Sequence, residues 1–259
     1  MPTAKLTIDA DAVDLTRRFF GLDRLYGDVP AQKVRSAHVV VVGIGGVGSW
    51  AAEALARSGV GRLTLIDMDH VAESNINRQV HAITPSVGMS KVLAMQQRIA
   101  LINPACQVTC LDEFVVPENW PAILPNGVDA VIDACDQVKS KTAMADWARR
   151  TKRVFISVGA AGGKRHAHKV DIGDLSETTH DPLLAQVRYR LRKTYGAPQS
   201  GKKLSVTCVF SREAVAPPSS ACVAPIDGTL NCHGYGSLVS VTSVFGMCAA
   251  GWVMDKISQ

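Results

Sequence analysis

Short runs of apolar and β-branched residues recur along the first two thirds of the chain. Four of them cover residues 38–42, 63–66, 129–133 and 154–158. These runs lack the apolar–polar alternation of a half-exposed strand, which predicts strands that are buried on both faces of a parallel sheet. Residues 107–111 form a further run and predict one more strand of this kind.

The stretches between these runs have the apolar spacing of helices. In residues 91–102, Val92, Met95 and Ile99 fall on one helical face, and Asn103 follows as a stop signal. Strands that alternate with helices up to about residue 159 indicate an α/β fold with a doubly wound, mostly parallel sheet and right-handed crossovers.

The composition becomes basic and polar after residue 163. Residues 181–193 have a helical pattern, and residues 204–210 form another apolar run that predicts a strand. No linker rich in Gly and Ser separates this part from the first. We therefore expect a single domain over residues 1–259, with a core in 30–163 and a C-terminal part in 164–259 that extends the sheet and covers one of its edges.

Composition and charge exclude several classes of protein. The chain has 259 residues, of which 47% are hydrophobic and 20% charged, so it can bury a large core. The formal net charge of +5 permits an acidic partner but does not favour a histone-like electrostatic binder. Seven cysteines without a Cys-x-x-Cys pair argue against a structural zinc site and a secreted disulfide framework.

Two segments bear on the location of the protein. Residues 1–15 contain three aspartates and no apolar core, which is unlike a signal peptide, so we expect a cytoplasmic protein. Residues 234–254 carry no charge and are long enough to cross a bilayer. Serine, threonine and glycine dilute this segment, which favours a small-residue helix inside a soluble domain over the alternative of membrane association.

A glycine-rich turn follows the first predicted strand. It places Gly43, Gly45, Gly46 and Gly48 directly before a helical run. Such a turn lets the backbone approach phosphates and directs the free N–H groups of the helix toward negative charge. Asp67 ends the second strand, where a carboxylate can accept hydrogen bonds from ribose hydroxyls. The pattern predicts a nucleotide site.

The residues beyond the second strand favour ATP over a nicotinamide cofactor. They supply two carboxylates, one amide and two cations, at Asp69, Asn75, Arg78, Lys91 and Asp136. Hydride transfer has no use for this set. Attack on a phosphate ester needs cations that neutralise charge at phosphorus and on the leaving group, with a carboxylate nearby to hold Mg²⁺.

These motifs together resemble the adenylation domain of the ubiquitin-activating, or E1-like, superfamily over about residues 17–163. The resemblance implies a Rossmann-like fold, with the phosphates or ribose of ATP bound by Gly43, Gly45, Gly46, Gly48, Asp67, Asp69, Asn75, Arg78 and Lys91. It also implies that Asp136 coordinates Mg²⁺ or positions the reacting carboxylate. In this superfamily an arginine near the N-terminus enters the partner subunit's site, and Arg24 matches it, which implies a homodimer.

Two absences and four runs select a branch of the superfamily. The zinc-binding Cys-x-x-Cys pairs of sulfur-carrier enzymes are missing, and no cysteine stands out for a thioester. Residues 47–57, 67–69, 181–183 and 206–211 resemble the tRNA threonylcarbamoyladenosine dehydratase branch over nearly the whole chain. This resemblance implies a ligase-like enzyme that uses ATP to cyclise N6-threonylcarbamoyladenosine at position 37 of tRNA through an acyl-adenylate. Ring closure within one nucleotide requires no enzyme nucleophile.

A tRNA substrate would account for the basic residues after residue 163. We expect contacts to the phosphates of the anticodon stem-loop from Lys164, Arg165, Arg188, Arg190, Arg192 and Lys193. Two alternatives remain open at this point. The chain could adenylate the C-terminus of a ubiquitin-like sulfur carrier, or serve as a non-catalytic nucleotide-binding scaffold that receives sulfur from a partner protein.

Overall fold

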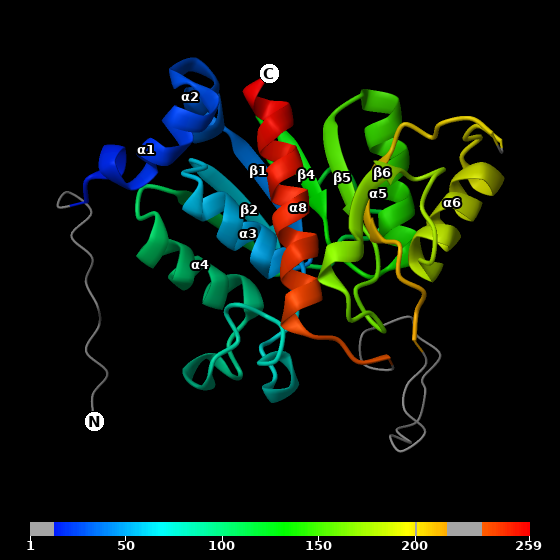
Figure 1. The fold of residues 1–259 in the computed structure, drawn as a ribbon, viewed down its shortest axis with the longest axis horizontal. Helices are drawn as coiled ribbons and strands as arrows, with labels where there is room; N and C mark the ends of the chain where they lie inside the picture. The colour runs from blue at the N-terminus through cyan, green and yellow to red at the C-terminus, as the bar shows by residue number, and fades with distance from the viewer. Residues whose placement is uncertain (1–12, 200, 217–234) are drawn as a thin grey trace.

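The computed structural model describes residues 13–199, 201–216 and 235–259, and within them one seven-stranded sheet in the order β3-β2-β1-β4-β5-β7-β6 (Figure 1). The strands are β1 (His38–Val42), β2 (Arg62–Ile66), β3 (Gln107–Leu111), β4 (Ala130–Asp133), β5 (Val154–Val158), β6 (Val170–Asp174) and β7 (Thr207–Ser211). Neighbouring strands run parallel except β6 and β7, which pair antiparallel. The predicted doubly wound, mostly parallel sheet is confirmed.

Helices cover both faces of this sheet. They are α1 (Leu15–Tyr26), α2 (Asp28–Ser36), α3 (Gly48–Arg57), α4 (Lys91–Ile102), α5 (Val138–Thr151), α6 (Pro182–Thr194) and α8 (Val239–Ser258). Successive β1 side chains point to opposite faces. Val39 and Val41 therefore pack in one core with α3, α4 and α8, and Val40 and Val42 in another with α5 and α6. The unbroken apolar run of β1 is thus explained by two buried faces.

The strand predicted at residues 204–210 begins later than expected. Ser205 has a φ of 57°, which interrupts extended backbone. The Asp174 carboxylate accepts hydrogen bonds from the backbone N–H of Leu204 at 2.8 Å and of Val206 at 3.2 Å. The Asp174 side chain, 30 residues before Leu204, thus fixes the backbone at residues 204–206. Strand β7 therefore starts only at Thr207.

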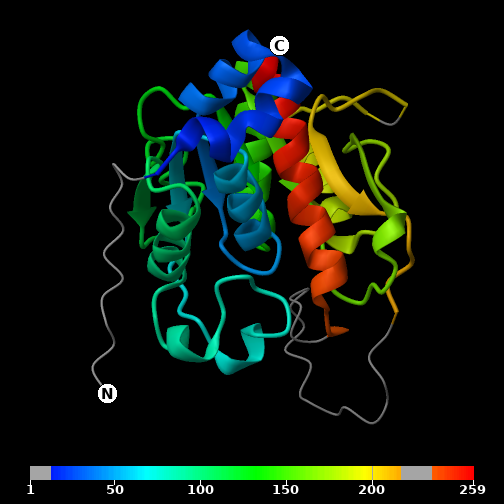
Figure 2. The ribbon, with the colours of Figure 1, turned by 60° about the vertical axis from the view of Figure 1, so that its left-hand side comes forward.

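The C-terminal part does more than extend the sheet at one edge. Strands β7 and β6 lie beyond β5, as expected, but α8 returns across one face and packs against α3 and β5 (Figure 2). A Cβ added at Gly246 would lie 2.5 Å from the Val47 carbonyl oxygen and 2.8 Å from the Ala51 nitrogen. Only a glycine therefore permits this approach of α8 to the helix that follows the glycine loop.

The uncharged segment at residues 234–254 contributes this internal helix, of which the structure describes 235–254. Val241, Phe245, Ala249 and Val253 are fully buried and follow a helical spacing. None of the described helices is both long enough and apolar enough to pass through a membrane. The prediction of a small-residue helix packed inside the domain is confirmed for the described part.

Candidate functional site

The glycine loop lies where the strand order reverses between β1 and β4, at the carboxyl ends of these strands. Gly43 has a φ of +84°, and a Cβ there would lie 2.8 Å from the Cys135 nitrogen. A Cβ at Gly48 would overlap the Gly43 carbonyl oxygen at 1.8 Å. At Gly45, by contrast, no described atom lies within 4 Å of the Cβ position. The turn is packed tightly on its inner side and open at Gly45, as close approach of a phosphate requires.

Asp67 connects the end of β2 to this loop. One carboxylate oxygen accepts from the Ile44 N–H at 2.6 Å and the other from the Asp69 N–H at 2.8 Å. Burial raises the pKa of the Asp67 carboxyl, and the Lys91 cation partly opposes that shift. The predicted ribose ligand is therefore also a brace for the glycine loop.

Lys91 and Asp69 form an ion pair of 2.6 Å beside Asp67. The Lys91 side chain is only 8% exposed, whereas that of Asp69 is 56% exposed. The Lys91 backbone N–H also donates to the Asp69 carbonyl at 3.0 Å, which fixes the start of α4 against the end of β2. A buried ammonium held in this way can attract a phosphate with little loss of side-chain entropy.

Arg78 is held by three elements of the fold. Its guanidinium donates to the Ser74 carbonyl at 2.7 Å, and its aliphatic carbons lie 3.4 Å from the position of a Cβ on Gly46. Its own carbonyl accepts from the indole of Trp50 on α3 at 2.9 Å and from the hydroxyl of Thr242 on α8 at 3.3 Å. The structure therefore brings Arg78 to the glycine loop, as predicted, and adds α8 as a support.

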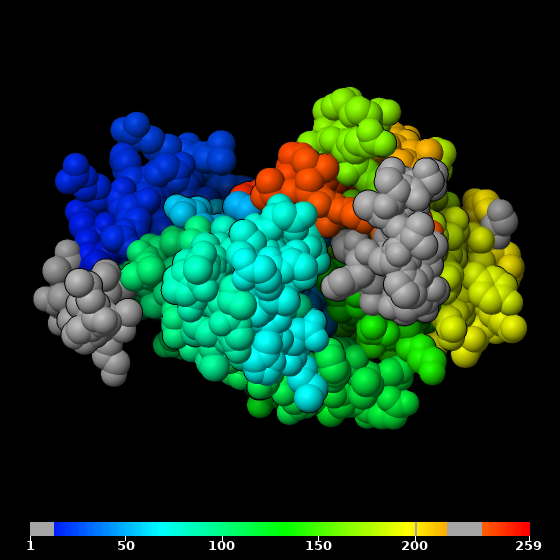
Figure 3. Space-filling model, turned by 90° about the horizontal axis from the view of Figure 1, so that it is seen from below, coloured from blue at the N-terminus to red at the C-terminus, as the bar shows by residue number. Residues whose placement is uncertain are grey.

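Asn75 and Asp136 differ in their exposure. Asn75 is buried, and its side-chain oxygen accepts from the Ala72 N–H at 3.0 Å, so it caps the 3-10 turn Glu73–Asn75. Asp136 is exposed just beyond β4, and its carboxylate accepts a hydrogen bond from the side-chain amide of Gln137 at 3.3 Å. Figure 3 views the molecule from this side, with the loop between β2 and α4 next to the start of α8.

The donor set fits Mg²⁺ only if the nucleotide shares in its coordination. Within residues 13–199, 201–216 and 235–259, no three His, Cys, Asp or Glu side chains gather as a protein-only metal site. Mg²⁺ commonly binds through one or two carboxylates together with substrate phosphates and water. The exposed carboxylate of Asp136 is suited to that mode.

Sequence reasoning missed Lys141, which lies beneath this site. Its ammonium is 3.0 Å from the Asp133 carboxylate, and both side chains are fully buried. It also donates to the carbonyls of Asp133 at 3.3 Å and Cys135 at 3.0 Å. Burial alone would lower the pKa of Lys141, but the Asp133 carboxylate outweighs it and raises this pKa. Its spacing on a helix gave no signal, because an isolated lysine is typical of an exposed face.

The described thiols near the site are poor nucleophiles. Burial raises the pKa values of Cys135 and Cys208 well above the usual range of a thiol. A protonated thiol is neither a good nucleophile nor a metal ligand. Among the described residues, the groups suited to nucleotide chemistry at this site are therefore cations, backbone N–H groups and carboxylates.

The glycine loop, with Asp67, Lys91 and Arg78 beside it, can be compared with known proteins. The ThiF family pattern matches residues 17–259. The chain belongs to the ThiF family. Among ThiF-family relatives, a tRNA threonylcarbamoyladenosine dehydratase of Haemophilus influenzae is 43% identical over 254 residues, 97% of either chain. One of Escherichia coli is 44% identical over 250 residues, 93% of either chain.

Solved ThiF-type structures share the fold as well. The Escherichia coli tRNA N6-threonylcarbamoyladenosine dehydratase, TcdA, in complex with ATP aligns with a TM-score of 0.84 at 43% identity, over 93% of this chain and 94% of that one. The complex of TcdA with AMP aligns with a TM-score of 0.85. Escherichia coli MccB, at 16% identity and a TM-score of 0.59, shows likeness of fold alone.

The basic C-terminal part of this ThiF-family chain is less uniformly exposed than predicted. Lys164 is only 1% exposed, and its ammonium donates to the carbonyls of His180 at 3.0 Å and Glu213 at 2.8 Å. Burial lowers the pKa of Lys164, with Asp181 and Glu213 opposing. Lys164 is therefore not among the cations that reach solvent, because its ammonium lies inside the protein.

The other five predicted tRNA contacts divide into two groups. Arg188 donates to the carbonyls of Leu175 and Thr178 at 2.9 and 3.0 Å, and Arg192 donates to the carbonyl of Pro198 at 3.2 Å. These two guanidinium groups are partly buried and help to fix α6. The side chains that reach solvent are Arg165, Arg190 and Lys193.

Arg24 does not join the glycine loop of its own chain. It lies on α1, where its guanidinium stacks over the Phe20 ring at 4.6 Å. Helices α1 and α2 precede the amino end of β1, whereas the glycine loop follows the carboxyl end (Figure 2). Arg24 and the glycine loop are thus at opposite ends of the sheet.

Proposed function

We propose that this chain is a tRNA threonylcarbamoyladenosine dehydratase, which uses ATP to convert N6-threonylcarbamoyladenosine at position 37 of tRNA into its cyclic form. The observation that carries this proposal is the likeness to named dehydratases over 97% of the chain, which includes the C-terminal part as well as the nucleotide site. A likeness limited to the nucleotide half would fit any adenylating enzyme. The enzyme would act in the cytoplasm, where its substrate resides.

The reaction begins with activation of a carboxylate. An oxygen of the threonyl carboxylate attacks the α-phosphorus of ATP, the bond to the β-phosphate breaks, and pyrophosphate leaves. Arg78 and Lys91 stabilise the negative charge that develops on the phosphate oxygens. The N–H groups at the start of α3 bind the phosphate chain from the open side of Gly45. The product of this step is an acyl-adenylate.

Ring closure follows within the same nucleotide. The carbamoyl group attacks the activated carbonyl carbon, AMP leaves with the carboxylate oxygen, and a proton is released, so that the net change is loss of water. The two reacting groups are already joined covalently, which gives the step a high effective concentration. The protonated thiols of Cys135 and Cys208 are consistent with a route that forms no enzyme thioester.

Asp136 would hold Mg²⁺ together with the phosphates of ATP. When bound there, the ion would neutralise charge on the leaving pyrophosphate. Asp67 would accept hydrogen bonds from the ribose, and Asp69 would keep the Lys91 ammonium oriented. The buried Asn75 would act through the turn that it caps, because its oxygen is already committed to the Ala72 N–H.

The anticodon stem-loop would lie against the exposed cations of the C-terminal part. Arg165 is exposed beside Glu213, and Arg190 and Lys193 lie on the outer face of α6. Such side chains bind phosphates without reading sequence. Arg188 and Arg192 would contribute by holding α6 in place.

The active protein would be a homodimer in which Arg24 serves the partner subunit. Arg24 is exposed and lies at the far end of the sheet from its own glycine loop. Next to it, Leu25 is 78% exposed and Val29 is 71% exposed. Large apolar side chains gathered in this way are typical of an interaction surface.

Nucleoside analysis tests the proposed function directly. Purified protein is incubated with ATP and tRNA that carries N6-threonylcarbamoyladenosine, and the digested nucleosides are measured by mass spectrometry. We expect a product lighter by one water with the native protein and with Lys33→Ala, an exposed lysine on α2. Lys91→Ala should yield none. Pyrophosphate exchange that depends on a sulfur-carrier protein, without any change in tRNA, would contradict the proposal and favour carrier adenylation.

A further inference from the structure

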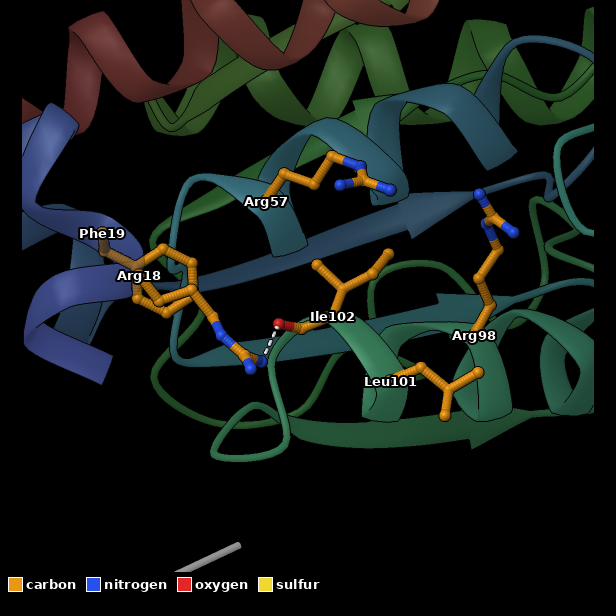
Figure 4. A pocket seen from close by; sticks show the side chains of 6 residues that line it. All are labelled: Arg18, Phe19, Arg57, Arg98, Leu101 and Ile102. Carbon is orange, nitrogen blue, oxygen red and sulfur yellow. Dashed lines mark hydrogen bonds between the residues drawn. The ribbon is translucent and has the colours of Figure 1, made fainter. Parts of the chain in front are cut away.

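Three arginines from three different helices surround a hollow of about 490 Å³ (Figure 4). Arg18 comes from α1, Arg57 is the last residue of α3, and Arg98 lies on α4. Phe19, Leu101 and Ile102 form an apolar wall beside them.

This hollow is separate from the nucleotide site. Arg57 stands nine residues beyond Gly48 on the same helix. At about 1.5 Å per residue, the two are roughly 14 Å apart along the helix axis. Neither the glycine loop nor the exposed cations of α6 line the hollow.

A single carboxylate orients two of the arginines. Glu53 is only 3% exposed in its side chain, and it accepts from the Arg57 Nε at 2.7 Å and from the Arg98 Nε and Nη2 at 2.7 and 3.0 Å. The third arginine, Arg18, donates to the Ile102 carbonyl at 2.6 Å, at the C-terminal end of α4. All three guanidinium groups are therefore held in place before any ligand arrives.

These contacts leave both charge and hydrogen-bond donors in excess. Three cations face one anion. A guanidinium has five N–H donors. Within the described residues, Arg18 and Arg57 each use one of them and Arg98 uses two. The side chains of Arg57 and Arg98 are 58% and 33% exposed, so their remaining donors can reach a ligand.

We propose that this arginine hollow binds a phosphate group outside the catalytic site. Planar guanidinium forks match the oxygens of phosphate, and orientation by Glu53 reduces the entropy that binding would cost. The phosphate has two chemical sources: the backbone of tRNA, which rests on the proposed function, or a free polyphosphate such as pyrophosphate, which does not.

The test compares Arg18→Gln with Arg17→Gln. Arg18 lines the hollow and leaves the Glu53 contacts intact when removed, whereas the exposed Arg17 next to it on α1 is not among the lining residues. Thermal unfolding of each variant establishes that it is folded. Arg57→Lys is a second variant, since it keeps the charge but removes the planar fork.

The first measurement uses inorganic pyrophosphate as the probe. It is titrated by calorimetry into protein whose glycine loop is saturated with a non-hydrolysable ATP analogue. If a free polyphosphate is the ligand, Arg18→Gln should weaken the remaining binding by roughly tenfold, in line with loss of a charged hydrogen bond. Arg57→Lys should weaken it as well, and Arg17→Gln should not.

The second measurement follows binding of tRNA by fluorescence anisotropy over a range of salt concentrations. If backbone phosphate is the ligand, Arg18→Gln should weaken binding several-fold and lower the salt slope by about one, with Arg17→Gln unchanged. A weakened binding in either measurement supports phosphate binding in the arginine hollow and identifies the source of that phosphate. If folded Arg18→Gln and Arg57→Lys match the native protein in both, or change only subunit association, the proposal is overturned. A native protein that fails to bind tRNA counts against the proposed function, while the pyrophosphate measurement still tests the hollow.

Discussion

The Lys141 ammonium and the Asp133 carboxylate are paired where neither reaches solvent, and the same ammonium binds the carbonyl of Cys135. The Cys135 nitrogen in turn stands 2.8 Å from the position of a Cβ on Gly43. The hydroxyl of Ser157 on β5 completes the arrangement by donating to Asp133 at 2.6 Å. A fully buried ion pair thus shapes the turn on which the glycine loop rests.

Replacement of Lys141 should therefore destabilise the whole fold. Lys141→Met leaves the Asp133 carboxylate buried and unpaired, and breaking a buried pair in this way costs about 3–5 kcal/mol. Denaturation in urea should show this loss in the free energy of unfolding. Lys139→Met, an exposed site two residues earlier on α5, should stay within about 0.5 kcal/mol of the native protein. Equal effects of the two substitutions would contradict the role given to the pair.

Gly246→Ala should separate α8 from α3 and weaken ATP binding. The added methyl group meets backbone atoms of Val47 and Ala51, which cannot move aside as a flexible side chain could. Strain of this kind costs about 1–3 kcal/mol. Gly251→Ala on the same helix has no described atom within 4 Å of its Cβ position and should stabilise the helix by up to about 1 kcal/mol. Calorimetric titration with ATP and thermal unfolding would measure both effects.

His81 should make the protein less stable in mild acid. Burial and the cations Lys91 and Arg98 lower its pKa from 6.5 to about 4. Neither ring nitrogen has a hydrogen-bond partner within the described residues. As pH falls from 6.5 to 4, the imidazole of His81 becomes protonated in the unfolded chain but stays neutral in the folded chain. The free energy of unfolding therefore declines by about 3 kcal/mol. Unfolding free energies measured across this range should decline less steeply for His81→Leu, and His168→Leu, an exposed site, should follow the native curve.

Mixed dimers should reveal a shared site. Arg24→Ala and Lys91→Ala proteins would each be inactive alone, because one lacks the arginine donated to the partner and the other lacks its own lysine. A mixed dimer contains one site with both residues intact, so combining the proteins should restore part of the activity. Absence of recovery in dimers whose mixed composition has been verified would argue that Arg24 does not act across the interface.

Charges on α6 should separate into binding and structural ones. Arg190→Gln removes an exposed cation and should lower the salt slope of tRNA binding by about one without loss of stability. Arg188→Gln breaks hydrogen bonds to the carbonyls of Leu175 and Thr178, so it should lower the melting temperature. A reduced slope for Arg188→Gln at unchanged stability would reverse this division.

Local pattern was sufficient for most of the sheet and for the glycine loop. The run at residues 38–42 is apolar because β1 is buried on both faces, and the helix at 91–102 has the predicted bounds. The start of β7 could not be predicted, since it depends on the distant carboxylate of Asp174. Edge strand β6 could not be predicted either, because it is half-exposed and lacks an apolar run.

Charged residues were the harder part of the site. The sequence does not distinguish a lysine whose ammonium lies in solvent, as at Lys193, from one whose ammonium lies inside the protein, as at Lys164 and Lys141. What distinguishes them is a carbonyl or carboxylate contributed by another element of the fold. Residue type and spacing do not indicate such a partner, so the sequence alone predicts that Lys164 and Lys141 are exposed.

The position of α8 has a consequence for biosynthesis. Thr242 on this helix binds the Arg78 carbonyl, and Gly246 rests on α3, so residues 239–258 belong to the nucleotide site although they are translated after every other described element. A nascent chain can assemble β1, β2 and β4 while α8 is still inside the ribosome, but its glycine loop then lacks the helix that supports it. We therefore expect ATP to stabilise the protein more strongly once α8 has packed on α3 than before.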